Sequence, residues 1–161
     1  MKITLQEGSI ADAPKDFVRV RFTDTQKEAG RFVKENGVET LELGTGKTEE
    51  MNARKFILLC RSIVQAAKAN KVKKIAIQFD TFQKFYNPQI GAENFEMANF
   101  EFNMFKTERK EGWDAVEEII LYEESSPSLA RAIEKGQEIG RAVNACRTLA
   151  NTPGGDMTPT L

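Results

Sequence analysis

The chain contains 161 residues, 40% hydrophobic and 29% charged, which is ordinary for a globular domain with one core and a tail. Its 23 basic and 24 acidic side chains give a net charge of -1, so no overall basic field exists to bind nucleic acid or an anionic membrane surface. It has no histidine, which excludes Ser-His and Cys-His catalytic pairs, and its two cysteines are isolated, so a metal ion would have to be bound by carboxylates alone.

The beginning of the chain is expected to form strands. Residues 1–5 and 17–22 alternate between apolar and polar side chains. In the second run Val18, Val20 and Phe22 share one face, opposite two arginines. The pattern predicts two half-buried strands.

A hairpin is expected next. Residues 31–34 and 38–43 are two further alternating runs, and they flank the dipeptide Asn36-Gly37. This dipeptide suits the positive backbone angles of a tight turn, so the two runs are predicted to pair.

The remainder of the chain is predicted to alternate helices and strands. Residues 52–70 have an apolar stripe at helical spacing. Ser126 and Pro127 form an N-cap and first-turn signal for a last helix that runs to about Ala150. Between these helices the pattern predicts a strand at 73–79, a helix at 92–105 and a strand at 118–122.

Strands followed by strand–helix alternation are typical of a layered α/β domain, with helices on both faces of a largely parallel or mixed sheet. Residues 80–91 are irregular and contain Phe82, Phe85, Tyr86 and Pro88. They form either a loop that packs on the core or one that waits for a partner. The first is favoured, because aromatic residues in connecting segments usually anchor them.

The expected compartment is the cytoplasm. No stretch approaches the roughly 18 apolar residues of a membrane span, and the first residues lack the apolar core of a signal peptide. The two cysteines, Cys60 and Cys146, lie far apart on predicted helices, where free thiols most often behave as small buried hydrophobes. This usage fits a reducing environment.

One short motif invites a nucleotide-binding interpretation. Gly46-Lys47-Thr48 precedes a predicted helix, as in loops that bind β- and γ-phosphates. The full pattern requires a glycine five residues before Gly46, where this chain has Leu41. The loop is too short to wrap a triphosphate, so the interpretation is disfavoured.

Clustered charges are the other candidates for chemistry. Adjacent carboxylates point apart on a strand and diverge on a helix, so a solvated face is favoured over acid–base partners or a cation site. A cluster of lysines around the start of the strand at 73–79 is similarly interpreted as a charged loop rather than an anion-binding site. The acidic pairs are Glu49-Glu50, Glu117-Glu118 and Glu123-Glu124, and the basic cluster is Lys71, Lys73 and Lys74.

The end of the chain resembles a linker. Residues 151–155 are helix stoppers and turn formers, and Thr158 is placed to cap a further helix that begins at Pro159. We therefore expect the chain to be a piece of a longer protein, with another element after Leu161.

These residues also point to a family. A small-residue helix, an Arg-x-Leu-x-Asn-Thr-Pro turn and a following Thr-Pro resemble the segment that joins the two domains of leucine aminopeptidases, the cytosolic two-metal exopeptidases. The residues in register are Asn144, Arg147, Asn151, Thr152, Pro153 and Pro159. Two less specific segments are also similar to the family's amino-terminal domain: Leu43-Gly-Thr-Gly46-Lys47 followed by Arg54, and Ala98-Asn-Phe-Glu-Phe102-Asn-Met-Phe105-Lys106.

The resemblance implies a fold and a division into parts. Residues 1–125 are expected to form a three-layer, macro-domain-like α/β domain with a mixed sheet and helices on both faces. Residues 126–161 are expected to form a long linker helix and an exit segment that lead to an absent catalytic domain.

The resemblance also implies a function. The domain would be non-catalytic, and it would help to assemble a homohexamer and shape access to active sites that remove amino-terminal residues from peptides. The family's two zinc, manganese or magnesium ions are bound by lysine, aspartate and glutamate side chains of the carboxy-terminal domain. No catalytic, cofactor-binding or metal-binding residue is therefore assigned in this chain, which alone should be inactive and contain no cofactor.

Two alternatives belong to other classes. A free-standing macro-like module could bind an ADP-ribose-type ligand, with Gly44-Thr-Gly46 as its candidate diphosphate loop and Asp80 as a candidate carboxylate. DNA binding, a side activity of some bacterial members of the family, is disfavoured by the acidic balance of charge and the lack of a basic stripe.

Overall fold

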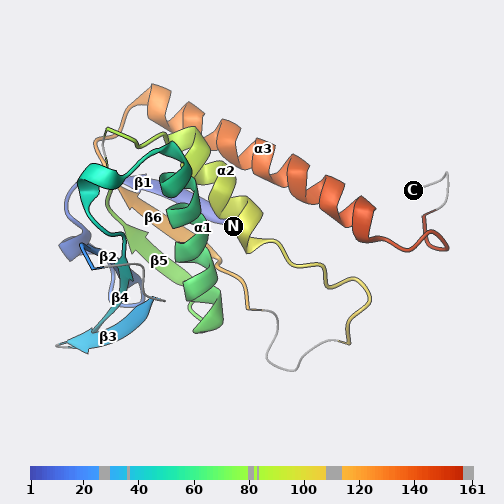
Figure 1. The fold of residues 1–161 in the computed structure, drawn as a ribbon, viewed down its shortest axis with the longest axis horizontal. Helices are drawn as coiled ribbons and strands as arrows, with labels where there is room; N and C mark the ends of the chain where they lie inside the picture. Colours follow the sequence, from blue (N-terminus) through green and yellow to red (C-terminus); the bar gives the residue numbers. More distant parts are fainter. Residues whose placement is uncertain (26–29, 36, 80–81, 83, 108–113, 158–161) are drawn as a thin grey trace.

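The computed structural model describes residues 1–25, 30–35, 37–79, 82, 84–107 and 114–157 (Figure 1). The expected helix at Pro159, like Asn36 and Asp80, lies outside the described residues. The elements, in chain order, are β1 (Lys2–Gln6), the 3₁₀ helix η1 (Ile10–Asp12), β2 (Val18–Thr23), β3 (Arg31–Glu35), β4 (Val38–Gly44), the 3₁₀ helix η2 (Thr48–Glu50), α1 (Ala53–Ala69), β5 (Lys74–Ile77), α2 (Pro88–Asn99), β6 (Glu118–Tyr122) and α3 (Pro127–Asn151).

The six strands form one mixed sheet in the order β1-β6-β5-β2-β4-β3. All neighbouring strands are parallel except β3, which runs antiparallel to β4 at one edge. Glu35 pairs with Val38 across the turn, and Gly37 has a φ of 79° there. The predicted hairpin and the α/β class with a mixed sheet are both confirmed.

The two faces of the sheet are covered unequally. One face packs under α1, α2 and α3, and its central strands contribute Ile75, Ile77, Ile119 and Leu121 to that core. On the opposite face the alternate residues of the same strands pack against η1 and the residues that follow it, in a smaller cluster of Ala13, Phe17, Ala76, Ile120 and Tyr122 with Ile10. Helical segments therefore lie over both faces, but all three α-helices share one of them. The likeness to a macro domain stays a prediction.

Helix α1 forms as its sequence predicts. The Asn52 side chain accepts a hydrogen bond from the backbone N–H of Lys55, which satisfies one of the free donors of the first turn. The apolar stripe then packs on the sheet through Phe56, Leu59, Cys60, Ile63, Val64 and Ala67.

Helix α2 does not have the predicted bounds. The expected helix covered 92–105, whereas α2 spans Pro88–Asn99. Asn87 caps it by accepting from the N–H of Ile90, and proline is favoured in the first turn. At the other end, the Asn99 side chain exchanges two hydrogen bonds of 2.8 and 2.9 Å with the backbone of Val116. The helical spacing of the later phenylalanines was misleading, because the backbone is already extended at the C-cap, Phe100.

The aromatic segment before α2 packs on the core, as favoured from the sequence. Phe82 is buried, and Phe85 and Tyr86 are partly buried against the main core. The Tyr86 ring lies 5.2 Å from that of Phe79 and 5.9 Å from that of Phe56, measured between ring centres. These aromatic contacts anchor the described part of the connection between β5 and α2.

The two cysteines differ in environment. Cys60 is buried in α1, and this burial raises the pKa of its thiol. Cys146 is exposed on α3, so the expectation of a buried thiol was wrong for this residue. Within the described part of the chain, no helix is both long enough and apolar enough to span a membrane.

Candidate functional site: the seam between α2 and α3

Helix α3 packs along α2, and α2 lies between α3 and α1 (Figure 1). The Ser126 side chain accepts a hydrogen bond from the N–H of Leu129, with Pro127 in the first turn, which confirms the predicted start. The helix ends at Asn151, one residue beyond the predicted end. We call its contact with α2 the seam. Close backbone approach, a buried polar network and helix-capping contacts meet there.

Two glycines bring the helix backbones close together at the seam. Gly136 and Gly140 are four residues apart and so lie on the same face of α3. A Cβ atom at Gly136 would be 2.2 Å from the carbonyl oxygen of Gln89. A Cβ atom at Gly140 would be 2.6 Å from the Cβ of Glu96 and 2.9 Å from the carbonyl oxygen of Glu93. No other residue type fits at these two positions without displacing α3.

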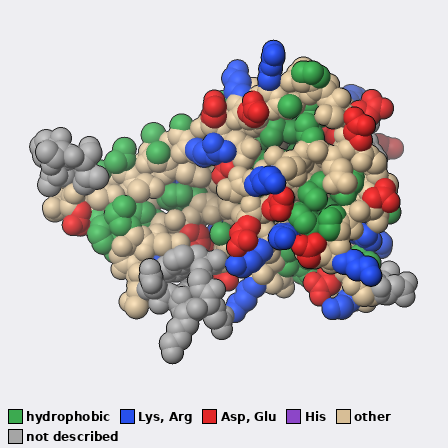
Figure 2. Space-filling view, turned by 180° about the vertical axis from the view of Figure 1, so that it is seen from behind, with side chains coloured by type: hydrophobic (Ala, Val, Ile, Leu, Met, Phe, Trp, Pro, Cys, Tyr) green, Lys and Arg blue, Asp and Glu red, His purple; other side chains and the backbone are tan. Residues whose placement is uncertain are grey.

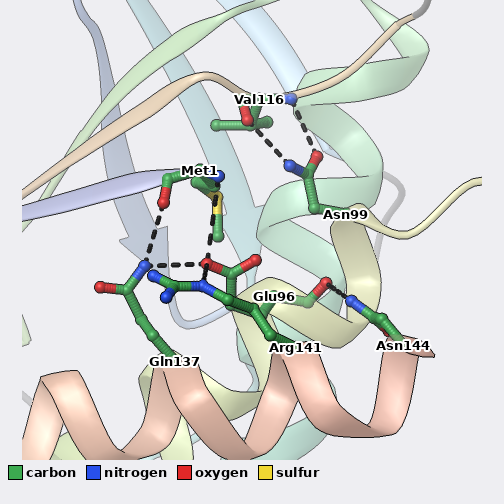
Figure 3. A network of polar contacts seen from close by, with 7 residues as sticks. All are labelled: Met1, Glu96, Asn99, Val116, Gln137, Arg141 and Asn144. Atoms are coloured by element: carbon green, nitrogen blue, oxygen red, sulfur yellow. Dashed lines mark hydrogen bonds and ion pairs between the residues drawn. The ribbon is translucent and has the colours of Figure 1, made fainter. Parts of the chain in front are cut away.

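A buried carboxylate lies between the helices (Figure 3). Glu96 of α2 is only 6% exposed. Gln137 donates from its Nε2 atom to Glu96 Oε1 at 2.8 Å and to the carbonyl oxygen of Met1 at 3.0 Å. The Met1 ammonium and Arg141 Nε lie 4.0 and 3.8 Å from the same carboxylate oxygen. A buried carboxylate needs such partners, and here they join α2, α3 and Met1, the residue before β1.

Side chains of α3 also cap the carboxy-terminal end of α2. Asn144 donates to the carbonyl oxygen of Glu96 at 2.9 Å, and Arg147 donates to that of Met97 at 2.8 Å. These carbonyls belong to the last turn of α2, where no intrahelical donor remains. The Arg147 guanidinium also lies 5.8 Å from the centre of the Phe100 ring, and its positive charge suits the negative end of the helix dipole. Two residues of the family-like pattern therefore fix α3 to α2.

The two carboxylates of the acidic pair Glu117-Glu118 have different partners. Glu117 pairs with Lys73 at 2.7 Å, whereas Glu118 pairs with Lys2 at 3.5 Å, as expected for adjacent strand residues that point apart. The hydrogen bond from Lys73 lowers the pKa of Glu117. Among the described residues, no group of three or more His, Cys, Asp or Glu side chains could hold a metal ion.

The basic cluster is likewise paired. Lys74 lies 2.8 Å from Asp16, and this hydrogen bond raises the pKa of Lys74 and lowers that of Asp16. Lys71 adopts a positive φ of 57° in the turn before β5. The interpretation of Lys73 and Lys74 as part of a charged surface is supported by these ion pairs.

The glycine loop after β4 does not lead directly into a long helix, as a phosphate-binding loop does. Gly46 has a φ of 71°, and the loop continues into η2 rather than directly into α1. Gly44, Thr45 and Gly46 border an open groove whose other residues come mainly from α1. They are both apolar, such as Leu58 and Leu59, and polar, such as Lys55.

Sequence reasoning missed the centre of the seam. Asn144 and Arg147 were noted for their position in a family pattern, but Glu96, Gln137 and the glycine pair were not singled out. Two signals were present: the spacing Gly136-x-x-x-Gly140, and a glutamate four residues after Ala92 on the apolar side of a predicted helix.

The sequence is similar to those of known aminopeptidases. A family model described as "Cytosol aminopeptidase family, N-terminal domain" matches residues 39–109. A probable cytosol aminopeptidase of Mannheimia succiniciproducens is 26% identical over 162 residues, which cover 95% of this chain and 32% of that protein. A second, from Alkaliphilus metalliredigens, is 29% identical over 126 residues, covering 73% of this chain and 25% of that protein. The chain thus spans only a quarter to a third of the length of these relatives.

Solved structures share the fold. A tomato leucine aminopeptidase superposes with a TM-score of 0.78 at 16% identity, over 99% of this chain and 40% of that one. The bottromycin maturation enzyme BotP gives a TM-score of 0.66 at 17% identity, over 90% of this chain and 34% of that one. The fold therefore defines an α/β domain found as one part of larger enzymes. Together with the matched segment, it makes the chain similar to the amino-terminal domain of the leucyl, or cytosol, aminopeptidase family.

Proposed function

We propose that the chain is the non-catalytic amino-terminal domain of a two-metal leucyl aminopeptidase that removes amino-terminal residues from peptides in the cytoplasm. In this proposal it supports assembly of a homohexamer and shapes access to the active sites. The partner of the domain is the carboxy-terminal part of the same parent protein, and the greater length of the curated relatives supports this.

The observation that carries the proposal is the fixed geometry of α3. The helix is held to α2 by two close-approach glycines, a buried polar network and two capping contacts. A flexible tether would not need such contacts. A helix that positions a second domain does need them, because the orientation of α3 then determines where the following polypeptide begins.

In this proposal the metal ions belong to the carboxy-terminal part of the parent. The family resemblance implies two divalent ions, zinc, manganese or magnesium, bound by lysine and carboxylate ligands. The described residues offer no cluster of three or more candidate ligands, and several carboxylates are already paired with lysines. No step of the proposed hydrolysis is therefore assigned to residues of this chain.

The test is expression of the reading frame that continues past Leu161, beside residues 1–161 alone. With manganese or zinc, the longer protein is expected to release leucine from leucyl peptides, and the shorter one is not. Light scattering should show a hexamer for the longer protein. A reading frame that stops at Leu161, or a longer protein without aminopeptidase activity, would contradict the proposal.

Neither alternative gains support from the structure or from the relatives. The candidate diphosphate loop leads into η2 rather than directly into the amino-terminal end of α1. Lys73 and Lys74, part of the basic cluster considered for anion binding, are paired with Glu117 and Asp16.

A further inference from the structure

We propose that an apolar surface at the far end of α3 is the docking surface for the polypeptide that follows Leu161 in the parent aminopeptidase. This inference rests on the proposed function. The surface consists of Met104 and Phe105, in the segment after α2, and Leu149 and Met157, at and beyond the end of α3. We call it the distal apolar surface.

Exposed large hydrophobic side chains are concentrated there. Met104 is 60% exposed, Phe105 52%, Leu149 53% and Met157 42%. Elsewhere in the described part of the chain, Leu58 at 41% is the only other large hydrophobic side chain in this class. Figure 2 shows hydrophobic side chains on the surface at the narrow end of the molecule. Single exposed hydrophobics are normal, but four at one end of a small domain indicate an interaction site.

The distal apolar surface is supported from within the chain. Arg147, two residues before Leu149, contacts both the carbonyl oxygen of Met97 and the ring of Phe100, at the start of the segment that holds Met104. Within that segment the rings of Phe102 and Phe105 lie 5.8 Å apart. The seam therefore holds both parts of the surface at the same end of the molecule, as Figure 1 also shows. A surface formed in advance binds with a smaller loss of conformational entropy.

We expect the distal apolar surface to be covered by the polypeptide that follows this domain in the parent. The curated relatives are about three to four times as long as the part that this chain matches, since the match spans 25% and 32% of them. The downstream polypeptide is covalently connected just beyond Met157, so its effective concentration at the surface is high and modest apolar burial suffices for docking. A second copy of this domain would have no such advantage.

Hydrogen exchange on the full-length parent tests the inference. In the double variant Met104→Gln/Leu149→Gln, amides in residues 100–106 and 145–157 are expected to exchange about tenfold faster than in the unmodified protein, because docking no longer protects them. The matched control is Leu58→Gln, an equally polar change at an exposed residue on α1, and it should leave these amides unchanged. Both side chains of the double variant are exposed in the domain itself, so its own packing should be retained.

Three results of the exchange experiment would overturn the inference. Equal exchange in the double variant and the unmodified protein would show that nothing docks on this surface. Equal acceleration by Leu58→Gln would show a global loss of stability. Protection that appears in residues 1–161 alone and rises with concentration would identify a second copy as the occupant. Aminopeptidase activity of the unmodified parent is measured in parallel, so a failure of docking is distinguished from a failure of the proposed function; a frame that stops at Leu161 would end both.

Discussion

Helices α1 and α3 are both amphipathic, but they are attached to the domain by different means. The buried residues of α1 are Phe56, Leu59, Cys60, Ile63, Val64 and Ala67. Those of α3 are Ile133, Gly136, Gln137 and Gly140. Helix α1 thus contributes bulk to the core, whereas α3 contributes mainly backbone proximity and hydrogen bonds.

The difference shows that the two helices have different tasks. A bulky apolar stripe supplies stability and tolerates small shifts, since volume-conserving changes in a core are usually accepted. Close approach at glycine and a buried polar network supply less burial but allow one relative position of the helices. The first arrangement suits a core helix, and the second suits a helix whose direction matters.

Removing bulk from α1 should have the largest effect. Ile63 is fully buried, so Ile63→Ala should leave a cavity and destabilise the domain by about 2–5 kcal/mol. Urea unfolding followed by circular dichroism measures this change. A loss below that range would mean that α1 does not anchor the core.

Adding a methyl group at the seam should have the next largest effect. Gly140→Ala places a Cβ against Glu96 and Glu93, so α3 must shift, at a cost of up to about 3 kcal/mol. Gly155→Ala, where a Cβ meets nothing within 4 Å, is the control and should be nearly neutral. The same urea midpoints compare the two variants. Equal effects would show that α3 is not closely packed on α2.

Removing the buried carboxylate should weaken the seam with less disruption. Glu96→Ala leaves Gln137 and the Met1 ammonium without their shared acceptor, at a cost of about 2 kcal/mol. The exposed Glu138 of α3 provides the control, as Glu138→Ala. Thermal unfolding of the two variants should separate them by several degrees. An unchanged melting temperature for Glu96→Ala would contradict the buried network.

Loss of one cap should cost less again. Asn144→Ala removes the hydrogen bond to the Glu96 carbonyl and should cost about 1 kcal/mol. Hydrogen exchange is the sharper measurement, because amides in the last two turns of α3 should exchange faster while those of α1 do not. Uniform acceleration in both helices would indicate global rather than local loosening.

The smallest effect is expected at the exposed pair of Asp16 and Lys74. The pKa of Asp16 is lowered from 3.8, so its contribution to stability is present above that pH and is lost as the pH falls through the lowered value. Asp16→Asn should therefore reduce the urea midpoint slightly at pH 7, and the difference from the unmodified protein should shrink as the pH falls below 3.8. A difference that does not change with pH would show that the effect is not due to the carboxylate charge.

Local patterns were sufficient to predict most of the elements. The alternation around Val20 and the stripe around Ile63 identify β2 and α1, because each residue there faces either core or solvent. Gly37 marks the hairpin, and Ser126 with Pro127 marks the start of α3. The end of α2 was not predictable in this way, because it depends on Asn99 meeting the backbone of Val116, a contact between distant parts of the chain.

Prediction of the seam from the sequence would require knowledge of the tertiary structure to an even greater extent. In sequence, Glu96 is one of many glutamates, and only the approach of Gln137 and Met1 distinguishes it from the solvated ones. The glycine pair has a recognisable spacing, but its significance depends on which helix lies opposite. Asn144 and Arg147 were noted through a family pattern, and the structure supplies their physical role as caps of a neighbouring helix.

The length of α3 beyond its last glycine amplifies small movements. At 1.5 Å per residue, Asn151 lies about 16 Å from Gly140 along the helix axis. A tilt of about 10° at Gly140 would thus displace the end of the helix by about 3 Å. Helix α3 therefore acts as a lever with its pivot at the seam, and one added methyl group there would redirect everything attached to its far end.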